Sequence, residues 1–186
     1  MAKRVFLVHR WGGNPNDDWY PWLKKELEIR GFEVHAPAMP NTEYPVIEEW
    51  VSTLEKAVGK PDKDTYFIGH SIGCQTIMRY LEKANAEIGG ALFIAGWFGL
   101  REFETPEERG IAEPWLTTPI DFEKVKKTAV KITAIFSLDD PFVPISDSSI
   151  FKEKLGAKTI TEKDKGHFNR EEYEIILTEF LKLVNQ

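Results

Sequence analysis

Short apolar runs alternate with longer segments of mixed polarity along most of this 186-residue chain. The apolar runs are rich in residues that favour strands buried on both faces. They predict strands over residues 5–8, 32–36, 66–68, 90–96, 132–136 and 157–161. Between these runs, apolar residues recur at helical spacing, with charged residues in the intervening positions. This second pattern predicts helices over residues 21–29, 46–58, 76–81, 121–127, 148–155 and 171–184.

Strands that alternate with helices are typical of an α/β domain with a largely parallel sheet. Right-handed crossover connections place the helices on both faces of such a sheet. We therefore expect a three-layer sandwich built on six mostly parallel strands, forming a single domain over residues 1–186.

Residues 97–120 interrupt this alternation, because they lack a clear period and contain three prolines. A long segment without regular structure inside a compact domain is usually a lid or a binding loop. We predict that residues 97–120 form a lid or pocket loop.

Composition narrows the function classes. Apolar residues make up 42% of the chain and charged residues 29%, which is ordinary for a soluble globular protein. The net charge is −6 and no basic stripe is present, which argues against binding to nucleic acid. The oligomeric state does not follow from these features.

The cysteine content and the lengths of the apolar runs indicate the cellular compartment of the protein. The single cysteine, Cys74, has no partner for an internal disulfide. The apolar run after Lys3 and Arg4 is too short for the core of a signal peptide. No apolar stretch approaches the ~20 residues needed to span a bilayer. We therefore expect a reduced, cytoplasmic protein without a membrane partner.

One stretch carries a recognisable chemical motif. Residues 69–73 read Gly-His-Ser-Ile-Gly, a G-x-S-x-G pattern between a predicted strand and a predicted helix. Strand, tight turn and helix are the context of a nucleophile elbow, in which a strained turn exposes the serine hydroxyl. Because the turn is tight, the residues two positions before and after Ser71 must be small, and they are Gly69 and Gly73. Ser71 is therefore the candidate nucleophile.

Two later loops supply partners for a serine nucleophile. Asp139 and Asp140 follow the fifth predicted strand, and His167 follows the sixth. The carboxyl ends of parallel strands meet at one edge of a sheet, so these loops should open beside Ser71. In this arrangement, His167 would remove the proton of Ser71, and one of the two aspartates would orient the imidazole. The order of serine, acid and histidine along the chain matches that of α/β-hydrolases.

Other residues can be interpreted in two ways. His9 could touch substrate, or it could brace its loop through hydrogen bonds. Four aromatic residues lie in loops expected near Ser71, and they could line an apolar pocket or form a small loop core: Trp97, Phe98, Trp115 and Phe142. Asp17 and Asp18 have no second cluster of metal ligands, so we predict helix capping there and no metal site. His70 is expected to pack at the end of the sheet rather than to act as the base.

The motifs together resemble the α/β-hydrolase superfamily. The resemblance is carried by Gly-His-Ser-Ile-Gly at 69–73, Ser-x-x-Asp-x-x-Val-Pro at 137–144 and Gly-His-Phe at 166–168. The tryptophan-rich segment 18–27 and Met39-Pro40 narrow it to the small serine hydrolases related to retinoblastoma-binding protein 9. The resemblance spans nearly the whole chain, and it implies a compact hydrolase fold without a separate cap domain.

The resemblance also implies roles for individual residues. It places the acid at Asp140, three residues before Val143, and leaves Asp139 as a turn residue. One oxyanion-hole donor should be the backbone N–H of Ile72, directly after the nucleophile. The second donor by resemblance is the N–H of Trp11, with Arg10 as the alternative, because Arg10 stands where the family often has glycine. No cofactor is implied.

These features favour a serine hydrolase that cleaves small, uncharged acyl esters in the manner of a carboxylesterase. The partner would be a small-molecule ester. Two alternatives stay open: a non-catalytic interaction module that retains the triad, and an acyltransferase or peptidase with the same nucleophile. The lack of a cap domain leads us to expect a preference for short acyl chains.

Overall fold

Six parallel strands form one sheet in the computed structural model, which describes residues 2–103 and 105–185. The strand order is β2-β1-β3-β4-β5-β6, and every neighbouring pair is parallel. The strands are β1 (Arg4–Val8), β2 (Glu33–His35), β3 (Thr65–His70), β4 (Gly90–Ile94), β5 (Ile132–Ser137) and β6 (Lys158–Glu162). The predicted α/β sandwich with six strands is therefore confirmed.

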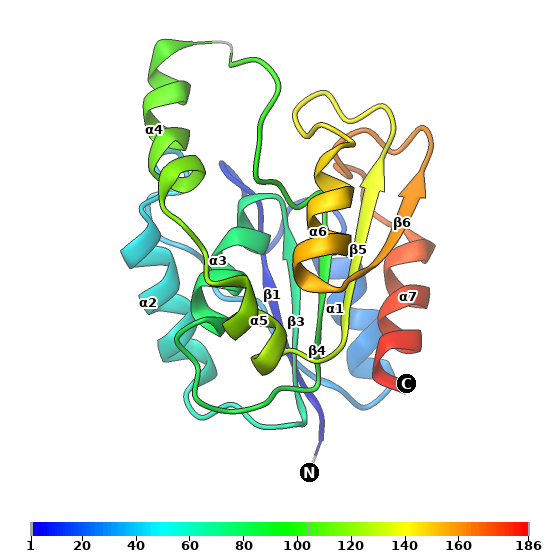
Figure 1. Cartoon of the computed structure of the whole chain (residues 1–186). Coiled ribbons are helices and arrows are strands. Elements are labelled where there is room, and N and C mark those ends of the chain that lie inside the picture. The colour runs from blue at the N-terminus through cyan, green and yellow to red at the C-terminus, as the bar shows by residue number, and fades with distance from the viewer. Residues whose placement is uncertain (1, 104, 186) are drawn as a thin grey trace.

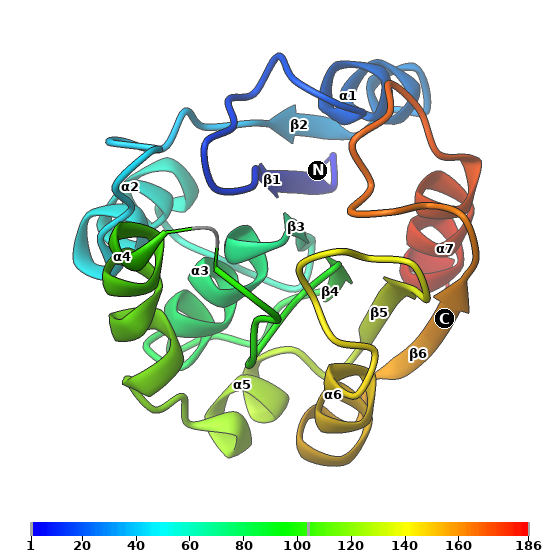
Figure 2. The ribbon, with the colours of Figure 1, turned by 90° about the horizontal axis from the view of Figure 1, so that it is seen from above.

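Helices cover both faces of the sheet (Figure 1). Seen from above, α1 and α7 lie on one face and α2, α3, α5 and α6 on the other (Figure 2). The helices are α1 (Tyr20–Ile29), α2 (Ile47–Val58), α3 (Ile72–Leu81), α4 (Pro106–Thr117), α5 (Phe122–Thr128), α6 (Asp147–Leu155) and α7 (Glu174–Asn185). Six of them match predicted helices, with ends that differ by up to four residues.

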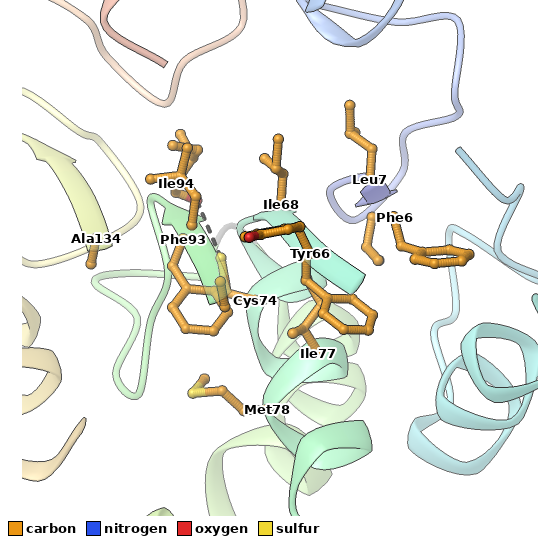
Figure 3. Packing of buried hydrophobic residues seen from close by; sticks show 14 of the residues in the cluster. Phe6, Leu7, Tyr66, Ile68, Cys74, Ile77, Met78, Phe93, Ile94 and Ala134 are labelled. Atoms are coloured by element: carbon orange, nitrogen blue, oxygen red, sulfur yellow. Dashed lines mark hydrogen bonds between the residues drawn. The ribbon is translucent and has the colours of Figure 1, made fainter. Parts of the chain in front are cut away.

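Strands β3, β4 and β5 are buried at every position, which explains their continuous apolar runs. Successive side chains of a strand point to opposite faces, so each face receives its own apolar layer. Phe93 faces Cys74 and Met78 of α3, whereas Ile68 and Ile94 point to the other side of the sheet (Figure 3). The core therefore lies in two layers, one on each side of the sheet.

Residues 97–120 contain helix α4, which corrects the prediction of an irregular loop. Thr105 begins the helix through a capping box: its hydroxyl accepts the Glu108 N–H, and the Glu108 carboxylate accepts the Thr105 N–H. At the other end, the guanidinium of Arg79 donates to the carbonyls of Trp115 and Thr118. In Figure 1, α4 stands beside and above the edge at which the strands end.

The chain direction changes between β1 and β3, which places the site. From β1 the chain crosses to β2 on one side, and it returns to β3 on the other side of β1. A crevice opens beyond the carboxyl ends of two strands whose connections diverge in this way. The loop after β1 and the turn after β3 therefore border this crevice.

Candidate active site

Ser71 lies in the sharp turn between β3 and α3, as the motif predicts. Its backbone has φ 55° and ψ −120°, in a region that residues other than glycine rarely adopt. Two hydrogen bonds hold this conformation. The Ser71 N–H donates to the Ile94 carbonyl at 2.9 Å, and the Ser71 carbonyl accepts the Cys74 N–H at 3.0 Å. The surrounding structure thus fixes a strained residue at the start of a helix, as is common at functional sites.

Both flanking glycines are required by close packing. A Cβ atom on Gly73 would lie 2.3 Å from the Val8 carbonyl oxygen, because α3 starts directly against the end of β1. A Cβ atom on Gly69 would lie 2.8 Å from the backbone nitrogen of Cys74. The G-x-S-x-G spacing therefore follows from the approach of the elbow to its own helix and to β1.

Asp140 and His167 form a buried pair in the loops after β5 and β6. Asp140 Oδ2 lies 2.8 Å from His167 Nδ1, and the two side chains are 2% and 8% exposed. Asp140 Oδ1 accepts the backbone N–H groups of Phe142 and Val143, so the carboxylate is held on both oxygens. Because the carboxylate accepts, Nδ1 of His167 carries a proton, and in the neutral ring Nε2 is left as the basic nitrogen.

Asp139 has a different set of contacts. Its carboxylate accepts the Ser137 hydroxyl and the backbone N–H groups of Lys165 and Gly166. The hydrogen bond from Ser137, followed by those from the backbone, lowers the pKa of Asp139 despite an opposing effect of burial. Asp139 therefore ties the loop after β5 to the loop that carries His167, whereas Asp140 contacts the imidazole itself.

Ser71 and His167 line one cleft, with a volume of about 680 Å³. Within the described residues the Ser71 hydroxyl has no hydrogen-bond partner. In free enzymes the hydrogen bond between nucleophile and base is often long, and it tightens only when substrate binds.

The backbone beside Ser71 has two unpaired donors. Among the described residues, the N–H groups of Ile72 and Trp11 have no acceptor. By contrast, the Arg10 N–H donates to the hydroxyl of Tyr20 at 3.0 Å, and the Gly12 N–H donates to the Thr42 carbonyl. Of the two residues considered as second donor, only Trp11 has an N–H free to bind an oxyanion.

The structure brings two of the five predicted pocket residues to the cleft. Trp97 and Phe142 line it, and the ring of Phe142 packs edge-on against the imidazole of His167. His9 is instead buried behind the loop: Nε2 accepts the Met39 N–H, and Nδ1 bonds to the Arg10 carbonyl. Burial, more than any other effect, lowers the pKa of His9. His9 therefore braces the loop and does not border the cleft.

Phe98 and Trp115 also lie outside the cleft lining. Phe98 packs against Phe122 and Phe151 between α5 and α6. Trp115 is buried under α4, where its indole N–H donates to the Pro45 carbonyl. For these two residues the alternative of a loop core is the one that the structure supports.

Sequence reasoning missed the wall that α4 and the segments near it contribute. The additional residues lining the cleft are Arg10, Gly12, Glu43, Tyr44, Leu100, Glu102, Phe103, Thr105, Glu107, Glu108, Ile111 and Asn169. The signal that was available is the capping box Thr-Pro-Glu-Glu at 105–108, which marks a helix start.

The charge of the cleft is mainly negative. Four glutamates line it, together with a single cation among its described residues, Arg10. Arg10 Nε lies 2.7 Å from Asp18 Oδ2, and that carboxylate is 7% exposed, so the positive charge is largely neutralised. Asp18 is thus an ion-pair partner and not a helix cap; Trp19 is the N-cap of α1, without a side-chain hydrogen bond.

The described residues contain neither a metal-binding cluster nor a membrane-spanning helix. No group of three or more histidine, cysteine, aspartate or glutamate side chains there could hold a metal ion. In the same part of the chain, no helix has the length and apolar character needed to cross a membrane.

Known proteins resemble this chain in sequence and in structure. YdeN of Bacillus subtilis (strain 168) is 29% identical over 174 residues, which cover 92% of this chain and 89% of YdeN. The serine hydrolase RBBP9 of Rattus norvegicus is also 29% identical over 174 residues, covering 92% of this chain and 90% of RBBP9.

Solved structures show the same fold. The crystal structure of the ydeN gene product of B. subtilis matches with a TM-score of 0.90 at 26% identity, over 100% of both chains. A carboxylesterase structure from Nitrososphaera gargenis has a TM-score of 0.75 at 16% identity, covering 100% of this chain and 92% of its own. The serine hydrolase family model matches residues 5–178, which include the elbow and both later loops. With its strained serine, its buried aspartate–histidine pair and a match over nearly its full length, the chain belongs to the serine hydrolase family.

Proposed function

We propose that the protein is a carboxylesterase that cleaves small, uncharged acyl esters with a triad of Ser71, His167 and Asp140. The observation that carries this proposal is the buried Asp140–His167 pair, which opens on the same cleft as the strained Ser71. A serine hydroxyl is a weak nucleophile until a positioned base removes its proton. His167 has the paired Nδ1 that leaves Nε2 available as this base.

The residues fit a two-step acyl transfer. Nε2 of His167 takes the proton of Ser71 as Oγ attacks the ester carbonyl, and Asp140 stabilises the imidazolium. The N–H groups of Ile72 and Trp11 stabilise the negative charge that develops on the carbonyl oxygen. His167 then protonates the departing alcohol, which leaves an acyl group on Ser71. Water attacks this ester by the same route and releases the acid.

The size and charge of the cleft support a small, uncharged ester. A volume of about 680 Å³ is within the range of pockets for small molecules. Four glutamates line the cleft against one ion-paired arginine, so a substrate with a carboxylate would be repelled. Helix α4 supplies one wall in place of a separate cap domain, which is consistent with short acyl chains.

A fluorophosphonate probe tests the proposal, because it reacts only with an activated serine. Wild type should be labelled, and Ser71→Ala should not be; His167→Ala should label far more slowly. The exposed Ser149→Ala is the matched control and should label like wild type. Absent labelling of wild type, or equal labelling of Ser71→Ala, would refute the proposal and favour a non-catalytic interaction protein.

Substrate choice is tested with p-nitrophenyl esters of increasing chain length. We expect the highest kcat/KM for acetate and butyrate. Faster turnover of long-chain esters would contradict the assignment to small acyl groups. Cleavage of amides, or acyl transfer to an added alcohol in preference to water, would move the protein to a peptidase or an acyltransferase.

A further inference from the structure

His70, directly before the nucleophile, is fully buried and has a partner on each ring nitrogen. Its Nε2 lies 2.7 Å from the backbone carbonyl oxygen of His167, 97 residues further along the chain. Its Nδ1 lies 2.6 Å from the hydroxyl of Tyr20 in α1. The same hydroxyl is 3.0 Å from the backbone nitrogen of Arg10. Four segments thus meet through one imidazole and one phenol.

The donor and the acceptor of each hydrogen bond in this series follow from the chemistry of the groups. A carbonyl oxygen only accepts, so Nε2 of His70 must donate to His167. Burial, followed by the nearby His167, holds the pKa of His70 well below its usual value, so the ring is neutral and Nδ1 must accept. Tyr20 therefore donates its O–H to His70, and its oxygen accepts the Arg10 N–H. Each group in the chain has its partner.

The two ends of this hydrogen-bond series lie at the proposed catalytic groups. One end is the main chain of His167, the proposed base. The other is the N–H of Arg10, whose pairing with Tyr20 leaves Trp11 as the next free donor in the loop. The middle residue, His70, is bonded covalently to Ser71. Base, nucleophile and oxyanion loop are thereby tied to one buried side chain.

We propose that His70 and Tyr20 are positioning residues that fix His167 and the N–H of Trp11 relative to Ser71. This inference rests on the proposed function, because it assigns the two residues to the same reaction. Neither side chain lines the cleft. A second, outer link joins the same two loops: Asp18 pairs with Arg10 and accepts a hydrogen bond of 3.4 Å from Asn169. The hydrogen bond from Asn169 is longer and more exposed than those of His70. The buried hydrogen bonds of His70 therefore set the geometry.

Tyr20→Phe is the most informative variant, because it removes a single oxygen atom and keeps the ring that packs against Trp19. It leaves Arg10 N–H and His70 Nδ1 without partners. A displacement of catalytic groups by about 1 Å can cost about 100-fold in rate. We expect kcat for p-nitrophenyl acetate to fall about 10- to 100-fold, with KM changed less than about threefold, because ground-state binding is not affected.

Matched variants separate positioning from packing. Tyr80→Phe removes the hydroxyl of another buried tyrosine, in α3, and should leave kcat unchanged. The His70 ring packs against that of His167, so substitutions there also alter packing. For this reason His70→Gln, which can still donate to the His167 carbonyl, is compared with His70→Leu, which cannot. His70→Gln should retain more activity.

The outcomes distinguish this inference from the proposed function. If wild type does not react with a fluorophosphonate, the proposed function fails. If wild type reacts and Tyr20→Phe reacts and turns over ester equally fast, the proposed function stands and the positioning role is wrong. Equal loss in Tyr20→Phe and Tyr80→Phe would also overturn it.

A spectroscopic measurement on wild type tests the hydrogen bonds of His70 without any variant. Nitrogen-15 NMR of histidine-labelled wild type should show His70 neutral with its proton on Nε2, because only that tautomer satisfies both partners. This holds whether or not the protein hydrolyses esters. A proton on Nδ1 in the neutral ring would overturn the proposed chain.

Discussion

At the residue scale, Asp139 and Asp140 are neighbours in sequence whose carboxylates hold different parts of the molecule. Asp140 bonds to the imidazole of His167, and Asp139 bonds to the backbone of the loop that carries it. The sequence alone placed both in the correct loop, because the carboxyl ends of parallel strands lie at the same edge of a sheet. It did not choose between them; the family resemblance favours Asp140, the one whose carboxylate contacts the imidazole.

Asp140→Asn should therefore lower kcat much more than Asp139→Asn. The amide in Asp140→Asn favours the wrong tautomer of His167, an effect that cost about 10⁴-fold in a serine protease triad. Asp139→Asn keeps the imidazole contact but weakens the loop, and we expect about a tenfold loss. Steady-state hydrolysis of p-nitrophenyl acetate measures both. A larger loss in Asp139→Asn would reassign the acid.

Side-chain direction is what the sequence could not supply. His9, Phe98 and Trp115 all lie in the expected loops, yet they point into packing that depends on helices α2, α4, α5 and α6. His9, for example, is held by the backbone of Met39, 30 residues away. Loop membership predicts neighbourhood, whereas the direction of a ring is set by long-range contacts.

At the element scale, glycines differ in how closely neighbouring atoms approach them. Gly73 packs against the carbonyls of Val8 and His9, whereas beside Gly110 in α4 no described atom outside the helix's own backbone lies within 4 Å of the position of a Cβ. The first glycine is required by the close approach of a helix to a strand. The second merely weakens a helix, since glycine is a poor helix former.

These surroundings predict opposite effects of the same substitution. Gly73→Ala should destabilise the protein by about 2 kcal/mol or more, because two carbonyl groups of the main chain would have to move. Gly110→Ala should stabilise it by about 0.5–1 kcal/mol. Urea unfolding of both variants gives the free energies. A Gly73→Ala variant as stable as wild type would contradict the packing argument.

Helix α4 escaped prediction because its signals are weak. Pro114 lies within it, and its apolar residues do not form a clear stripe. The capping box at Thr105 was the strongest local signal. The carboxyl end of α4 is held by Arg79, which is 36 residues away from Trp115 and 39 from Thr118. A long-range contact of this kind leaves no mark in the local sequence.

An ion pair joins helix α7 to the edge strand β6. Glu179 is 4% exposed and accepts hydrogen bonds from Lys158 in β6 and from Lys182. Burial alone would raise the pKa of Glu179, but the two lysines outweigh it and the pKa is lowered. A carboxyl group with a lowered folded-state pKa stabilises the fold when it is ionised.

Glu179→Gln should therefore destabilise the protein in a pH-dependent way. At neutral pH we expect a loss of about 1 kcal/mol, because the lysines are half exposed and screened by solvent. The loss should be complete above the unfolded-state pKa of about 4.3 and should vanish as the pH falls through the lower folded-state pKa. Urea unfolding between about pH 3 and pH 7 measures it. The exposed Glu174→Gln is the control, and an equal loss at all pH values would contradict the assignment.

At the scale of the whole molecule, the parallel sheet accounts for most of what the sequence predicted. Because all six strands are parallel, the loops after β1, β3, β5 and β6 lie at one edge, and a serine, an acid and a histidine far apart in sequence converge there. The match to solved structures confirms the predicted α/β-hydrolase fold. A cytoplasmic location stays a prediction.

The charge of the molecule gives a further test. Net charge −6 and four glutamates at the cleft should disfavour an anionic ester. We expect kcat/KM for p-nitrophenyl succinate, which carries a carboxylate, to be at least about tenfold below that for the butyrate ester at low salt. The gap should narrow at about 0.5 M salt. It should also narrow in Glu107→Gln but not in Glu113→Gln, on the same helix but outside the cleft. Equal rates for both esters would contradict this.

The backbone of Ser71 has a consequence for how this chain evolves. A residue with a side chain at φ 55° costs about 1–3 kcal/mol of strain that glycine would avoid. Ser71→Gly should thus be about 1 kcal/mol more stable than Ser71→Ala in urea unfolding, although both should be inactive. A lineage that had ceased to use the hydroxyl would gain stability by drifting to glycine at this position.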